Sequence, residues 1–178
     1  EIIEKKDQIR NMVEIFAFGA LFMIAVYYLG LFFMKKSEMS FLVFALFSLT
    51  IAVRVLFTGK YLYSYFFTNL LWEWVLKIEL LTVCISAMLL VKLVRNIYSN
   101  NISIKLSYIW YVWSTLYILI GIFFPVYWIA SIMKIYNISQ IIIGFVVMFK
   151  IFGYFDRKRK TEAYFFMVGF LILLAACL

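Results

Sequence analysis

Long apolar blocks, separated by short polar or charged segments, limit the fold of this chain more than any other feature of its sequence. Hydrophobic residues make up 67% of the 178 residues, whereas a soluble domain holds about 45–50%. In bilayer hydrocarbon, only helices and closed barrels satisfy all their backbone hydrogen bonds. The ten-residue alternating strands of a barrel are absent from the sequence. The sequence therefore predicts an all-α, polytopic transmembrane helical bundle.

Six apolar blocks predict six membrane spans. Residues 1–10 are charged, and we expect them to extend the first span as an extracellular juxtamembrane helix. The chain starts at Glu1 without a methionine and stops at Leu178 inside an apolar run, so we expect a fragment of a longer protein. Residues 11–178 form the predicted transmembrane domain, with spans at about 11–34, 41–57, 70–94, 106–124, 131–155 and 163–178.

The distribution of basic residues predicts the orientation of the chain. Ten of the 17 lysines and arginines would lie on one side of the membrane. Loops rich in Lys and Arg stay in the cytoplasm. We therefore expect a multi-pass protein of the cell inner (plasma) membrane with its N-terminus outside. The ten residues are Lys35, Lys36, Lys92, Arg95, Lys105, Lys150, Arg157, Lys158, Arg159 and Lys160.

The candidate site is a group of charged residues within the second and third spans. Inserting a charge at mid-span costs about 2.5–3.5 kcal/mol on insertion scales, so such residues usually face protein, a cavity or a ligand. Arg54 lies within the second span, and Glu73, Lys77 and Glu79 lie within the third. Glu73 and Lys77 are four apart with the acid first, which favours a local pair. We expect Arg54 to lie near Glu73 or Glu79, either as a fixed ion pair that holds the two helices in register or as part of a polar pocket or switch.

Other polar residues of the spans have both a structural and a functional interpretation. Trp72 is either a residue of the outer aromatic belt or a ligand-stacking residue. Gln140, on one helix face with Gly144, either bonds between helices or forms a second pocket wall. The seven-residue spacing of Ser107, Ser114 and Gly121 indicates packing positions in the fourth span. Ligand or switch candidates are therefore Arg54, Trp72, Glu73, Lys77, Glu79 and Gln140.

Catalytic signals are poor. The chain has no histidine, which removes histidine acid–base chemistry and most zinc sites. Paired carboxylates for hydrolysis, metal-ligand clusters and a phosphate-binding loop are missing from the sequence. We expect a protein that is not an enzyme, has no metal or cofactor and binds no nucleic acid, because membrane topology explains the net charge of +8. Cys84, in the third span, is expected to be a buried free thiol.

Two stretches carry a family resemblance. One is YYLGLFFMKKSEMSFLVFALFSLTIAVRVLFTGKYL, from Tyr27 to Leu62, and the other is WEWVLKIELLTV, from Trp72 to Val83. In these stretches the chain resembles the membrane region of bacterial seven-transmembrane receptors with diverse intracellular signalling modules. Weaker similarity to the same family continues as far as the run from Gly169 to Leu173. The resemblance implies seven spans, an extracellular sensing domain before them and a cytoplasmic output domain after them, such as a histidine kinase or a cyclic-dinucleotide enzyme.

The predicted function is that of a membrane sensor that passes an extracellular or membrane-embedded signal to an output domain. Its expected partners are the lipid bilayer, a small-molecule ligand, the two flanking domains of the same receptor and a second copy in a homodimer. The main alternative is a six-span, substrate-binding transport component of an importer. A structural assembly subunit is a third alternative. A channel fits less well, because no charge ring or filter-like loop is present.

Overall fold

A computed structural model of the chain describes residues 2–36, 38–58, 72–97 and 104–153. All regular secondary structure in these residues is α-helical, and the described part holds no strand. The prediction of an all-α fold is therefore confirmed for these residues. The helices are α1 (Ile2–Met34), α2 (Met39–Thr58), α4 (Trp72–Ile97), α5 (Ile104–Phe123) and α6 (Val126–Gly153).

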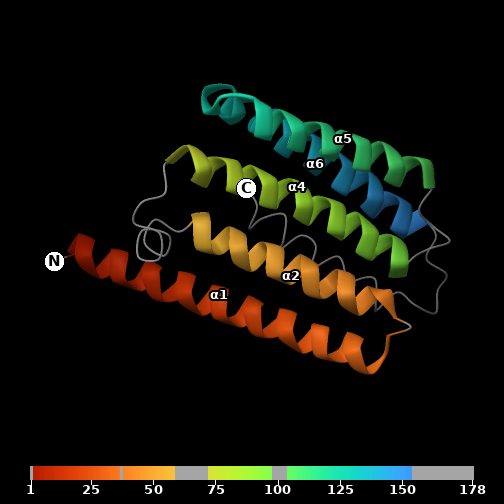
Figure 1. The fold of residues 1–178 in the computed structure, drawn as a ribbon, viewed down its shortest axis with the longest axis horizontal. Helices are drawn as coiled ribbons and strands as arrows, with labels where there is room; N and C mark the ends of the chain where they lie inside the picture. Colours follow the sequence, from red (N-terminus) through yellow and green to blue (C-terminus); the bar gives the residue numbers. More distant parts are fainter. Residues whose placement is uncertain (1, 37, 59–71, 98–103, 154–178) are drawn as a thin grey trace.

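Successive helices run in opposite directions with α4 in the middle (Figure 1). Helix α4 contacts α2 on one side and both α5 and α6 on the other, while α5 and α6 also contact each other. Within the described part of the chain, α1 contacts α2 alone. Any displacement of α5 or α6 relative to α2 therefore acts on α4, and this makes α4 the helix that couples the two sides of the bundle.

The expectation of six spans is not supported. Within the described residues, three helices are long and apolar enough to cross a membrane. The apolar stretches of α5 and α6, Ser107–Phe123 and Met133–Val146, are shorter. At 1.5 Å of rise per residue they fall below the ~30 Å of bilayer hydrocarbon. The last expected span, 163–178, lies outside the described residues. The three long segments are Gln8–Met34, Met39–Thr58 and Glu73–Asn96.

Tight turns connect α1 to α2 and α5 to α6. In the first turn, Lys35 forms an ion pair with Glu38, and the carbonyl of Glu38 accepts the N–H of Phe41 at 3.2 Å as α2 begins. In the second, Pro125 separates two helices. Proline has no N–H and fixes its φ angle, so it ends one helix and suits the start of the next. Helix α6 accordingly begins at Val126, five residues before the expected start of the fifth span.

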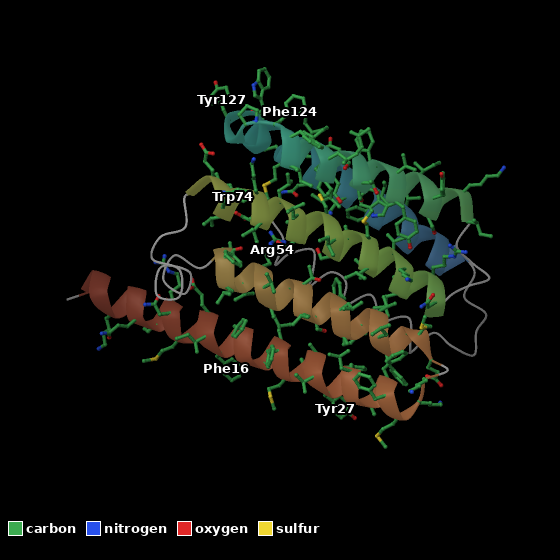
Figure 2. The ribbon with its side chains drawn as sticks, viewed as in Figure 1. Phe16, Tyr27, Arg54, Trp74, Phe124 and Tyr127 are labelled. Atoms are coloured by element: carbon green, nitrogen blue, oxygen red, sulfur yellow. The ribbon has the colours of Figure 1, made fainter. Side chains whose placement is uncertain are left out.

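Aromatic and small side chains join α1 to α2. The ring of Tyr28 on α1 lies 4.4 Å from Phe44 and 6.2 Å from Phe41 on α2, measured between centroids. Ala25 is buried beside them on α1. The opposite face of α1 carries large exposed apolar residues, including Phe16 and Tyr27 (Figure 2). Such a surface is costly in water and favourable in lipid.

A second core joins α4, α5 and α6. It contains Leu80, Val83 and Cys84 of α4, Tyr117 of α5 and Tyr136 of α6, all of them buried. Ser107, Ser114 and Gly121 lie along the buried face of α5, which confirms that they are packing positions. Cys84 is a buried free thiol, as the sequence predicted.

Candidate functional site

Arg54 lies near the end of α2, beside the first turns of α4. Its side chain is half-buried, and Figure 2 places it at the end of the bundle that also carries Trp74. Arg54 is about 6 Å along the helix axis from the end of α2 at Thr58, and Glu79 is about 10 Å from the start of α4. Because α2 ends and α4 begins at the same end of the bundle (Figure 1), both charges lie toward that end. The pairing of Arg54 with Glu73 or Glu79 stays a prediction.

The charged residues of α4 have different surroundings. Glu73 is exposed, whereas Lys77 and Glu79 are half-buried. The Nζ atom of Lys77 donates to the carbonyl oxygen of Ile122, in the last turn of α5, at 3.4 Å. It also lies 5.6 Å from the ring centroid of Trp74, within range of a cation–π attraction. Lys77 therefore reaches a neighbouring helix, a contact that its four-residue spacing from Glu73 did not predict.

Trp72 is the first residue of α4, and its side chain lies outside the described part of the structure. Its predicted belt or stacking role stays a prediction.

The hydroxyl groups near the charged residues bond to their own helices. On α4, Thr82 donates to the carbonyl of Glu79 at 2.8 Å, and Ser86 donates to Val83 at 2.9 Å. On α2, Thr58 donates to the carbonyl of Arg54 at 2.8 Å. Side chains of this kind commonly satisfy themselves on the preceding turn. These hydroxyls are therefore already engaged and do not need a ligand.

A second polar group was missed by the sequence analysis. We call it the Tyr136 cluster: Tyr136 with Ser114, Tyr117, Trp110 and Cys84. The hydroxyl of Tyr136 lies 3.0 Å from Oγ of Ser114. The Tyr136 ring is 4.6 Å from that of Tyr117 and 6.0 Å from that of Trp110, measured between centroids. Tyr136 is fully buried. It therefore joins α6 to α5 by a polar contact and by ring packing, and to α4 through the apolar core.

Gln140 lies one turn after Tyr136 on α6 and is half-buried. Its Nε2 atom, the indole Nε1 of Trp110 and Oγ of Ser107 are buried and have no hydrogen-bond partner among the described residues. Leaving a donor unsatisfied costs about 1–3 kcal/mol. The interface of α5 and α6 thus carries polar atoms that the neighbouring helices do not satisfy. The structure separates Gln140 from Arg54, because α6 does not contact α2 within the described residues.

No group of three or more Cys, Asp and Glu residues that could hold a metal ion is found in the described part of the chain. The charged groups that the described residues offer are a guanidinium on α2, a carboxylate toward the same end of α4, and an ammonium on α4 that reaches the end of α5.

These features define a class of protein: a helical membrane protein with charged residues inside its bundle. A family model described as 7TM diverse intracellular signalling matches residues 10–178. The chain belongs to this family, and the predicted resemblance is confirmed. No significant match was found among curated proteins or among solved structures.

Proposed function

We propose that this chain is the membrane region of a receptor and transmits a signal across the bilayer to a cytoplasmic output domain of the same protein. The observation that carries the proposal is membership of a seven-helix signalling family over nearly the whole chain. The central position of α4 supports it, because a signalling bundle needs a helix that neighbouring helices can displace.

In this proposal, six spans of the seven-helix bundle belong to residues 11–178, and the N-terminus lies outside the inner membrane. The chain itself performs no catalysis. Enzymatic output belongs to the domain that follows the bundle, and the signal comes from an extracellular domain or from a small molecule bound within the bundle.

The proposed two-state element is the group of charged residues from Arg54 to Glu79, where α2 contacts α4. The side chains of Arg54 and Glu79 are half-buried, so each charge is partly removed from water and depends on protein groups. Exchange of such a charge between partners changes the relative position of two helices. A ligand shifts this equilibrium only by its differential affinity for the two arrangements.

The test uses the full-length receptor and measures the output activity with and without stimulus. Arg54→Ala and Glu79→Gln are expected to change the ratio of stimulated to basal output at least severalfold, at unchanged expression. Glu38→Gln is the matched control, because it makes the same carboxylate-to-amide change in the α1–α2 turn. The proposal is wrong if Arg54→Ala and Glu79→Gln leave both folding and output as in the unmodified receptor.

The family match does not favour the alternative of a transport component. A retained substrate together with ATPase-dependent uptake would be the result that revives it.

A further inference from the structure

The last turn of α5 leaves backbone carbonyls that α5 itself cannot satisfy. In an α-helix each carbonyl accepts the N–H four residues later. Pro125 stands four residues after Gly121 and has no N–H, and α5 ends at Phe123. The carbonyl end of a helix also carries a partial negative charge of about half an electron. In an apolar environment such carbonyls need a donor from elsewhere.

Lys77 of α4 supplies a donor. Its ammonium lies 3.4 Å from the carbonyl oxygen of Ile122. A lysine near the carbonyl end of a helix is favourable both as a donor and as a charge on the helix dipole. Here the lysine comes from a different helix, so the interaction ties α4 to the end of α5.

The backbone geometry that brings Lys77 within reach depends on Gly121. A Cβ atom at Gly121 would lie 2.5 Å from Cδ2 of Leu80. Leu80 follows Lys77 by three residues and so shares its face of α4. Ile122 directly follows Gly121. The Leu80–Gly121 contact and the Lys77–Ile122 contact are therefore consecutive along one seam between α4 and α5.

Glu73 is a second possible partner for the ammonium of Lys77. It lies one turn earlier on α4, in the order that favours an acid–base pair, and it is exposed. A lysine side chain can reach Glu73 or Ile122, and attraction to the carboxylate would draw its ammonium away from the end of α5. The two contacts compete for the same charge.

We propose that Lys77 is a positioning residue that holds the α5–α6 turn against α4, and that Glu73 competes with the carbonyl of Ile122 for its ammonium. The turn bears exposed aromatic residues, including Phe124 and Tyr127 (Figure 2), so it is accessible to a signal from outside the bundle. The part of this inference that concerns signalling rests on the proposed function. The clamp itself does not.

The test is hydrogen–deuterium exchange of purified protein in detergent, followed by mass spectrometry of peptides that cover residues 119–128. Lys77→Met keeps the length of the side chain and removes its charge, and it is expected to speed exchange of this turn about threefold or more. Lys77→Arg should restore slow exchange. Glu73→Gln removes the competing partner and should slow exchange. Lys134→Met is the matched control, because Lys134 is an exposed lysine of α6.

Equal exchange in Lys77→Met and the unmodified protein would overturn the clamp, as would an equal increase in Lys134→Met. If Lys77→Met does not fold, Glu73→Gln decides, and faster or unchanged exchange in that variant contradicts the competition. Hydrogen–deuterium exchange is measured on the purified protein and does not depend on signalling output. A confirmed clamp with unchanged receptor output would therefore contradict only its role in transmission.

Discussion

At the scale of single residues, the molecule handles its polar side chains in two ways. Thr50 on α2 and Thr82 and Ser86 on α4 donate to carbonyls of the preceding turn of their own helices. On α5 and α6, Ser114 and Tyr136 instead bond to each other across the helix interface. A bond within a helix leaves the helix free to move as a unit, whereas a bond between helices fixes their relative position. The Tyr136 cluster is therefore one part of the described bundle that resists displacement of α6 relative to α5.

Tyr136→Phe tests this role. The substitution keeps the ring and removes the hydroxyl that bonds to Ser114. We expect a loss of about 1 kcal/mol of stability, measured as a lower midpoint of thermal unfolding in detergent. Tyr127→Phe is the control, because Tyr127 is 86% exposed. If both variants unfold at the temperature of the unmodified protein, the bond contributes nothing to stability.

At the scale of helices, the sequence predicted the packing features that depend on the spacing of residues along one helix. The seven-residue repeat of Ser107, Ser114 and Gly121 identified the buried face of α5, because residues seven apart share a helix face. The contact of Lys77 with Ile122 was not predictable, because its partner lies 45 residues away and its carbonyl lacks a partner within the helix because α5 ends at Phe123. Tyr136 was missed because nothing local distinguishes it from the other tyrosines of the chain.

The pairing of Arg54 illustrates the same limit. Its presence within an apolar span and its nearness to α4 follow from the sequence and from antiparallel packing. Its partner depends on how far each helix is rotated about its axis, which no spacing rule determines.

Gly121→Ala tests the close approach of α4 and α5. Replacing glycine by alanine within a helix is usually favourable by about 0.5–1 kcal/mol. At Gly121 the new methyl group meets Leu80, which is fully buried and has little room to move. We expect Gly121→Ala to be less stable than Gly30→Ala by about 1 kcal/mol or more, because nothing lies within 4 Å of a Cβ atom at Gly30.

The measurement is thermal unfolding of Gly121→Ala, Gly30→Ala, Leu80→Ala and the double variant Leu80→Ala/Gly121→Ala. In a double-mutant cycle the two changes should be non-additive, since the smaller residue at position 80 makes room for the methyl group. Strict additivity would mean that the two residues do not determine the spacing of these helices.

At the scale of the whole molecule, the exposed apolar surface and the distribution of charge predict how the bundle is oriented in the bilayer. The outer faces of α1, α5 and α6 expose large apolar side chains, which suits contact with lipid acyl chains. The α1–α2 turn carries Lys35 and Lys36, whereas the α5–α6 turn carries aromatic residues and no lysine or arginine. Because α1 and α5 run in opposite directions (Figure 1), the turns that follow them lie at opposite ends of the bundle.

The positive-inside rule then predicts which turn faces the cytoplasm. After Cys84 and Cys177 are replaced by alanine, single cysteines are introduced as Lys36→Cys and Tyr127→Cys and tested in intact cells with a thiol reagent that does not cross the membrane. Both parent side chains are exposed. We expect Tyr127→Cys to react in intact cells and Lys36→Cys to react only after permeabilisation. The reverse pattern would place the N-terminus inside, and the proposed direction of signalling across the bundle would then be wrong.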